Sequence, residues 1–352
     1  MGYKFEGIQG VTKEAIREAF LWERAEDSNV ICNLCPRRCR IRDGGVGACG
    51  VRANDSGTLY TLVYGLAVSA NVDPIEKKPI FHMYPGSRSM SIATVGCNLS
   101  CLFCQNWEIS QISKGSSRRL LGRELMPEDV VSLAIRYGCA TISYTYTEPT
   151  IFMEYAYDTA KLAREKGIRN IFVTNGYMTK EALDLIAPYL DGANVDLKSF
   201  KDETYKKVMG GSLEPVLSTI KGMKEKGIWV EVTTLIVPGM NDSEEEIKAI
   251  AEFIKGVGEE IPWHISRFYP HYRMQDRGQT PMHILKRARD IGKEAGLRYV
   301  YTGNVPGDEG ENTYCYSCGT TLIRRFGFQI LDMRIKDGNC PRCGAKIDGI
   351  WG

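Results

Sequence analysis

From about Thr94 onward, strand-like and helix-like segments alternate along the chain, which is the pattern of βα units wound around a parallel sheet. The clearest helix is expected after Ser243, because Ser243 and Glu246 have the spacing of a capping box and apolar residues then repeat on one face. The expected strands are 90–95, 140–145, 170–174, 192–197, 228–237, 264–269 and 298–301. The other expected helices are 127–137, 150–166, 180–189 and 281–295. Six βα units of this kind predict an α/β fold with a partial (β/α)6 barrel rather than a closed eightfold one.

Cysteine is the residue type that says most about chemistry. The chain has twelve cysteines and only four histidines, so thiolates must dominate any metal binding. In an intracellular chain of this size such a number indicates metal and redox chemistry rather than a disulfide framework. The clusters are Cys32/Cys35/Cys39/Cys49, Cys97/Cys101/Cys104 and Cys315/Cys318/Cys340/Cys343. The remaining Cys139 is expected to be a small buried thiol.

Composition and charge exclude several classes of partner. The 352 residues are 43% hydrophobic and 25% charged, which predicts a soluble globular protein with a sizeable core. The net charge is only +2, so the chain has no strong positive potential that would indicate binding to nucleic acid or to an anionic membrane. The first residues lack the apolar run of a signal peptide, and the longest apolar stretch, 60–72, is too short to span a membrane. We therefore expect a cytoplasmic protein, with no membrane partner and nucleic acid not indicated.

The central cysteines follow the first expected strand directly, as Cys97-x3-Cys101-x2-Cys104. Ligands gather at the carboxyl ends of parallel strands, so this loop is well placed for chemistry. A structural zinc site normally has four ligands in two separated pairs, whereas three cysteines suit a cubane [4Fe-4S] cluster with one iron left open. An open iron can chelate the amino and carboxylate groups of S-adenosylmethionine, and electron transfer into the sulfonium then releases a 5′-deoxyadenosyl radical.

This spacing after a first strand resembles the radical S-adenosylmethionine (radical SAM) superfamily. The segments TYTEP, TNG and DLK lie where the pyruvate formate-lyase activating enzymes carry their adenosylmethionine contacts. A narrower resemblance, to the AmmeMemoRadiSam system radical SAM enzymes, comes from CNLCPRRC, DPIEKKPIFHMYPGS and SYTYTEPT, and covers the chain up to about Asn304. The resemblance implies an oxidoreductase with Cys97, Cys101 and Cys104 as catalytic cluster ligands, and a reducing electron donor such as a flavodoxin or ferredoxin.

The resemblance also implies a role for Glu148. It lies at the acidic end of the activating enzymes' Gly-Gly-Glu motif, whose carboxylate receives the adenosylmethionine amino group. Here Tyr146 and Thr147 replace the two glycines, so the approach of the backbone to the cofactor differs. The alternative is that Glu148 is only a helix N-terminal charge favoured by the dipole.

Four further cofactor contacts are implied at strand ends. Asn175 and Lys198 are expected to contact the carboxylate and ribose of the cofactor, with Asp196 supporting Lys198 or a monovalent cation. His271 resembles the ribose-contacting histidine region only loosely, because Pro-Tyr-His reads Pro-His-Tyr here. The alternatives are an Asp196–Lys198 pair that serves stability alone and a surface histidine. Lys77 and Lys78 line either the substrate side of the barrel mouth or a plain charged turn.

The two outer clusters predict small metal-binding modules. The pairs Cys315/Cys318 and Cys340/Cys343 form two knuckles of a rubredoxin-like or zinc-ribbon module; zinc is favoured, and mononuclear iron would offer an electron route. For Cys32, Cys35, Cys39 and Cys49, zinc, an auxiliary iron-sulfur cluster and a site without metal all stay open. The expected domains are an N-terminal module at 1–70, a radical SAM core at 71–311 and a C-terminal module at 312–352.

The leading functional hypothesis is an enzyme that abstracts hydrogen through the deoxyadenosyl radical. Its substrate is unknown: a protein glycine, a peptide and a small molecule are the alternatives, and the activating-enzyme likeness favours a protein. Modification of RNA or of a metabolite is a rival within enzymes. The non-enzyme alternative is a metal-stabilised zinc-ribbon interaction scaffold without radical chemistry.

Overall fold

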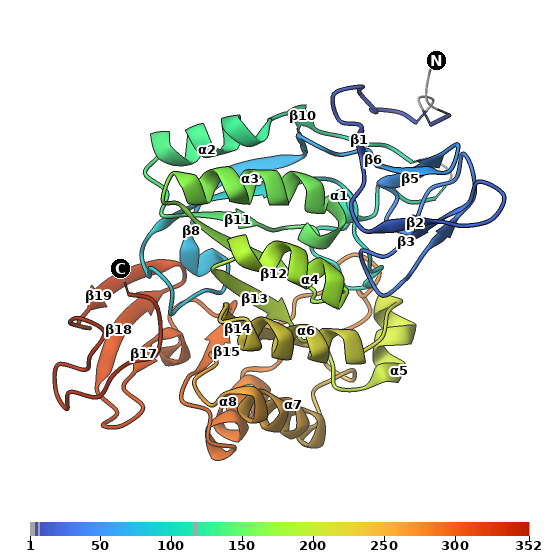
Figure 1. Ribbon diagram of the computed structural model, residues 1–352. Helices are drawn as coiled ribbons and strands as arrows, with labels where there is room; N and C mark the ends of the chain where they lie inside the picture. The colour runs from blue at the N-terminus through green and yellow to red at the C-terminus, as the bar shows by residue number, and fades with distance from the viewer. Residues whose placement is uncertain (1–3, 6–7, 116–117, 352) are drawn as a thin grey trace.

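The computed structural model describes residues 4, 5, 8–115 and 118–351. Within them the central sheet has eight strands in the order β16-β15-β14-β13-β12-β11-β9-β8 (Figure 1). Its strands are β8 (Ser69–Pro74), β9 (Arg88–Ala93), β11 (Thr141–Tyr144), β12 (Arg169–Thr174), β13 (Gly192–Asp196), β14 (Trp229–Ile236), β15 (Trp263–Arg267) and β16 (Val300–Gly303). Neighbours from β9 to β16 are parallel, whereas β8 is an antiparallel edge strand. The predicted α/β fold is confirmed.

Helices connect the parallel strands. They are α2 (Pro127–Arg136), α3 (Met153–Glu165), α4 (Lys180–Ile186), α6 (Glu214–Glu225), α7 (Glu244–Val257) and α8 (Met282–Glu294). Shorter helical segments are η1 (Ile75–Lys77), α1 (Trp107–Ser110), η2 (Pro149–Phe152), η3 (Ala187–Tyr189), α5 (Asp202–Thr204), η4 (Tyr205–Met209) and η5 (Glu309–Glu311). The Ser243 hydroxyl accepts from the amide of Glu246 at 3.3 Å, so the predicted N-cap of α7 is confirmed.

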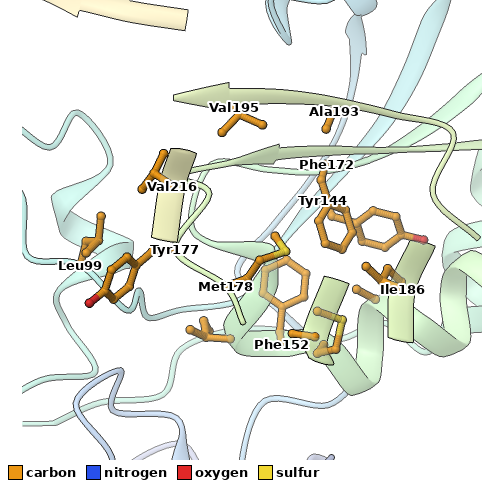
Figure 2. Packing of buried hydrophobic residues seen from close by; sticks show 14 of the residues in the cluster. Leu99, Tyr144, Phe152, Phe172, Tyr177, Met178, Ile186, Ala193, Val195 and Val216 are labelled. Carbon is orange, nitrogen blue, oxygen red and sulfur yellow. The ribbon is translucent and has the colours of Figure 1, made fainter. Parts of the chain in front are cut away.

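The helices bury one face of the sheet. Tyr144 of β11 and Phe172 of β12 point toward α3 and α4, and their ring centroids lie 5.4 Å apart (Figure 2). Val195 of β13 lies on the same side, near Val216 of α6. Because side chains alternate along a strand, the intervening residues, such as Asp196, face the interior of the barrel instead.

The N-terminal segment forms two small antiparallel sheets beside the barrel (Figure 1). Their strands are β1 (Arg17–Glu18), β6 (Thr58–Thr61) and β5 (Arg52–Asp55) in one, and β2 (Trp22–Arg24), β3 (Val30–Cys32) and β4 (Arg40–Ile41) in the other. A further pair is β7 (Leu66–Ala67) with β10 (Arg123–Glu124). Arg52 and Glu154 of α3 form a buried ion pair at 2.8 Å, which ties this segment to the core.

The C-terminal segment is a three-stranded antiparallel sheet of β17 (Thr313–Tyr314), β18 (Thr321–Phe326) and β19 (Gln329–Met333). The buried Arg325 donates to the Thr313 hydroxyl at 2.8 Å and to the Phe81 carbonyl at 3.1 Å, and its guanidinium lies 4.2 Å from the centre of the Phe81 ring. These contacts fix the sheet to the barrel.

The division of the chain at residues 70 and 311 stays a prediction.

Across the described part of the chain, the helices are all too short or too polar to cross a membrane.

Candidate functional site

A pocket of about 430 Å³ opens at the carboxyl ends of the parallel strands. It is lined by residues from the loops after β9, β11, β12 and β13, together with residues of the chain before β9. The structure brings together here nine of the residues that were singled out in the sequence: Lys77, Lys78, Cys97, Cys101, Cys104, Glu148, Asn175, Asp196 and Lys198.

The three cysteines of the loop after β9 all face this pocket. The Leu99 amide donates to the Cys97 sulfur at 3.4 Å, and the Asn175 side-chain amide lies 3.6 Å from the same atom. The Ser110 hydroxyl lies 3.2 Å from the Cys104 sulfur. Such polar groups are the ones that orient metal-bound thiolates and tune iron-sulfur clusters.

Three thiolates at one pocket suit a polynuclear cluster. A cubane binds each of its cysteine ligands to a different iron, so three ligands leave one iron open. Among the described residues, the set whose ligand atoms all lie within 4.8 Å of one another, as the ligands of a single ion would, is the C-terminal quartet.

Glu148 is fixed by four hydrogen bonds at the pocket wall. Its carboxylate accepts from the amide and hydroxyl of Thr150 at 3.0 and 2.6 Å, from the Thr174 hydroxyl at 2.7 Å and from the Asn175 amide at 2.8 Å. The side chain is 1% exposed, and burial raises its pKa while these donors lower it. Glu148 is also the N-cap of η2, so the expected helix-capping role is present together with the pocket position.

Asp196 and Lys198, which also line the pocket, form an ion pair of 2.7 Å. Burial alone would lower the pKa of Lys198, but the neighbouring Asp196 carboxylate and Cys101 thiol raise it above its ordinary value. The ammonium therefore stays charged. It lies 5.9 Å from the centre of the Phe103 ring, which also lines the pocket.

Asn175 joins two loops, while His271 lies apart. The side-chain amide of Asn175 donates to the Asn98 side-chain oxygen at 2.8 Å, which links the loop after β12 to the cysteine loop. His271 is half-buried, forms a β-bridge with Met274 and is not among the lining residues of the pocket. Its assignment as a cofactor contact stays a prediction.

The structure adds a charged cluster at the pocket wall that sequence reasoning saw only in part. Asp73 binds Lys77 at 2.8 Å and Lys78 at 2.7 Å, and it accepts a hydrogen bond from Tyr146. Lys78 is 1% exposed and lies 4.4 Å from the Tyr146 ring centre; burial lowers its pKa to about 8. In the sequence, the i, i+4 spacing of Asp73 and Lys77 was the feature from which this ion pair could have been predicted.

Tyr146 has an unusual backbone. Its φ of +62° lies in the left-handed region that favours glycine, at the position where the activating enzymes carry the first glycine of their motif. The Tyr146 phenol donates to the Asp73 carboxylate, and Tyr146 also lines the pocket.

The C-terminal quartet can hold one metal ion. The sulfurs of Cys315 and Cys343 are 3.6 Å apart, those of Cys318 and Cys340 are 3.7 Å apart, and all four lie within 4.8 Å of one another. These separations match a tetrahedral ion with four thiolate ligands.

Replacing Cys315 and Cys340 with serine is expected to remove about one metal ion per chain and to raise amide hydrogen exchange across β17–β19, because metal binding supplies much of the folding free energy of such modules. Elemental analysis and exchange mass spectrometry measure both effects. Cys139→Ser, at a buried thiol outside the three clusters, is the control. Unchanged metal content and exchange would rule out a metal in this module.

Comparison with known proteins decides the family. Residues 91–254 match the Radical SAM superfamily model. An uncharacterized protein of Methanocaldococcus jannaschii is 48% identical over 336 residues, which cover 95% of this chain and 99% of that protein. The chain belongs to the radical SAM superfamily. The matched region contains the central triad and Glu148, Asn175, Asp196 and Lys198, but neither outer quartet and not His271.

More distant relatives of this radical SAM protein are named enzymes. The pyruvate formate-lyase 1-activating enzyme of Escherichia coli K12 is 24% identical over 196 residues, covering 51% of this chain and 75% of that enzyme. The crystal structure of a radical SAM methyltransferase from Sphaerobacter thermophilus superposes with a TM-score of 0.50 at 17% identity, over 65% of this chain and 71% of that one. The predicted superfamily and fold are confirmed, and the AmmeMemoRadiSam assignment stays a prediction.

Proposed function

We propose that this radical SAM protein reductively cleaves S-adenosylmethionine at a [4Fe-4S] cluster bound by Cys97, Cys101 and Cys104. The radical produced then abstracts hydrogen from a separate substrate. One observation carries the proposal: the three cysteines share a single pocket with Glu148 and with the Asp196–Lys198 pair, at the carboxyl ends of parallel strands.

A cluster at this triad supplies an open iron site and one electron at low potential. The residues of the chain do the rest. Glu148 is held by four donors, so its carboxylate is already oriented to receive an ammonium group, and this preorganisation costs no rearrangement on binding. Lys198 remains charged beside Asp196 and can donate to carboxylate or hydroxyl groups of the bound nucleoside.

The substrate side of the pocket is assigned to the Asp73 cluster. Lys77 and Lys78 line the pocket and together exceed the charge of Asp73 by one. Such a wall suits a substrate with an anionic or carbonyl group. The name of the activating-enzyme relative supports a protein as substrate, and a flavodoxin or ferredoxin is the expected electron donor.

The test is anaerobic reconstitution with iron and sulfide, followed by reduction in the presence of S-adenosylmethionine. The expected result is a brown protein that forms 5′-deoxyadenosine and methionine, quantified by liquid chromatography and mass spectrometry. A colourless protein that retains only zinc and forms no deoxyadenosine would overturn the proposal and favour an interaction scaffold.

Glu148→Gln is expected to raise the KM for S-adenosylmethionine by about 10- to 100-fold, because a charge-assisted hydrogen bond to the amino group is lost. The iron content and visible spectrum should stay those of the parent protein. Steady-state kinetics of deoxyadenosine formation measure the effect, and Glu165→Gln, at the exposed end of α3, is the matched control. An unchanged KM would leave Glu148 with its capping role alone.

A further inference from the structure

The N-terminal quartet surrounds a small cavity of its own. Cys32, Cys35, Cys39 and Cys49 line it together with the apolar side chains of Leu34, Ile41 and Ile151. The other three thiols all act electrostatically on Cys35, so the four sulfurs are near one another. Three of the four are buried, and only Cys39 is partly exposed. Four thiolates in an apolar enclosure suit a soft metal centre shielded from water.

The N-terminal quartet differs from the other two groups of cysteines. Among the described residues, the set whose sulfurs all lie within 4.8 Å of one another, as the four ligands of one tetrahedral ion would, is the C-terminal quartet. Unlike the central triad, the N-terminal quartet offers a fourth thiolate, so each iron of a cubane would have its own cysteine ligand.

Arg52 supplies an independent sign of a missing acceptor. This side chain is 1% exposed, lines the same cavity and binds Glu154 and the Phe20 carbonyl through its terminal nitrogens. Its buried Nε has no hydrogen-bond partner in the described part of the chain. An unpaired buried donor is costly, so an acceptor is expected in the cavity. Inorganic sulfide or thiolate sulfur of a cluster would accept this hydrogen bond.

The N-terminal cavity lies beside the loop that carries Cys97. Gly96, which precedes Cys97, has a φ of +101°, and a Cβ at this position would lie 2.9 Å from the Cys49 carbonyl oxygen. Asn98 lines the N-terminal cavity and also binds Asn175 of the central pocket. Lys114 interacts electrostatically with both Cys97 and Cys49. The segment that carries Cys97 therefore packs against the segment that carries Cys49.

The outer side of the quartet is basic. Arg40 and Arg42 are exposed just after the loop that carries Cys35 and Cys39, whereas Arg38 in that loop is paired with Glu181 at 3.0 Å. A cluster with four thiolates is negative overall, so these charges, with Arg52 on the inner side, favour its binding. The same surface complements an acidic protein such as a flavodoxin or ferredoxin.

We propose that the N-terminal quartet binds a second [4Fe-4S] cluster and relays electrons to the central site. An acidic carrier protein gives it one electron and is itself oxidised by one; the second cluster returns to its oxidised state when it passes that electron inward. No proton or group moves in this step. The relay role rests on the proposed function, whereas the presence of the cluster does not.

The first experiment removes the central ligands and leaves the quartet. After anaerobic reconstitution, the variant Cys97→Ala/Cys101→Ala/Cys104→Ala is expected to retain about four irons and about four sulfides per chain. Its reduced form should give a cluster electron paramagnetic resonance (EPR) signal that S-adenosylmethionine does not change. Sulfide analysis distinguishes a cluster in the N-terminal quartet from a single iron in the C-terminal quartet, because a mononuclear iron site contains no inorganic sulfide. Folded protein without sulfide, or with zinc in the quartet, would overturn the proposal.

The second experiment keeps the central triad and replaces Cys32 and Cys35 with serine. Sulfide per chain should fall to half the parent value. Deoxyadenosine formation driven by dithionite should continue, whereas formation driven by reduced flavodoxin should fall to background. Equal flavodoxin-driven rates in parent and variant would overturn the relay. If the parent protein forms no deoxyadenosine at all, the proposed function fails, yet sulfide in the triad variant still decides whether the second cluster exists.

Discussion

Replacing Cys101 with alanine is expected to reduce reductive cleavage of S-adenosylmethionine to the level of an enzyme-free control. Cys101 is a buried member of the central triad, and its loss leaves two thiolates for a cluster that binds three. No other cysteine lines the pocket among the described residues, so none can take its place. Deoxyadenosine formation under dithionite, with iron and sulfide analysis of the same samples, measures the effect.

The matched control is Cys139→Ala. Cys139 is also buried, at 7% exposure, but lies outside the pocket, just before β11. This variant is expected to retain the iron, the sulfide and the cleavage rate of the parent. A Cys101→Ala protein that still cleaves the cofactor at the rate of this control would contradict the assignment of the triad.

Replacing Glu231 with alanine is expected to lower the free energy of unfolding by about 3–5 kcal/mol, because it leaves buried partners without their acceptor. Glu231 is fully buried and lies 2.7 Å from the ring of His264. It also accepts from the amides of Phe81 and His82 at 2.8–3.0 Å and from the Trp229 indole at 3.0 Å. It thereby holds Phe81 and His82 in place, and Arg325 of the C-terminal sheet donates to the Phe81 carbonyl. Urea unfolding at pH 7 measures the loss.

The pH dependence of stability gives a second readout for Glu231. Burial raises its pKa, but His264 and the amide donors lower it further, to a net value below the ordinary 4.5. A carboxylate with a lowered folded-state pKa stabilises the protein above its unfolded-state pKa, and this contribution is lost as the pH falls through the folded-state value. The parent should therefore lose stability below about pH 4.5 more steeply than Glu231→Gln. Glu252→Ala, on the exposed face of α7, should change stability by about 0.5 kcal/mol or less. If Glu231→Ala lowered the free energy of unfolding by as little as Glu252→Ala does, the account would be contradicted.

Much of the fold follows from local pattern. The parallel strands were predictable because buried β-branched and aromatic runs such as that of β12 alternate with amphipathic helices. Strand β8 was not, because its sequence SANVDP contains residues typical of loops and it pairs on one side only. Helix α6 was also missed, because Gly222 lowers the helix propensity of this short segment.

The site was predictable where one short segment carries the chemistry. The cysteine triad is such a segment. Glu148, Asn175 and Lys198 each follow a strand that had been placed, and Asp196 lies at the end of one. Contacts that depend on tertiary structure were beyond this reasoning. Tyr146 is 73 residues from Asp73 in the sequence, yet its phenol donates to that carboxylate. His271 shows the reverse case, in which a reordered motif gave a candidate that the structure places outside the pocket lining.

The most direct test of the central claim is EPR spectroscopy of the reduced protein with S-adenosylmethionine labelled with ¹⁵N in its amino group. If the triad leaves one iron open, the cofactor will change the cluster signal and the ¹⁵N nucleus will show hyperfine coupling to it. A cluster signal that is identical with and without the cofactor, and free of ¹⁵N coupling, would contradict the account.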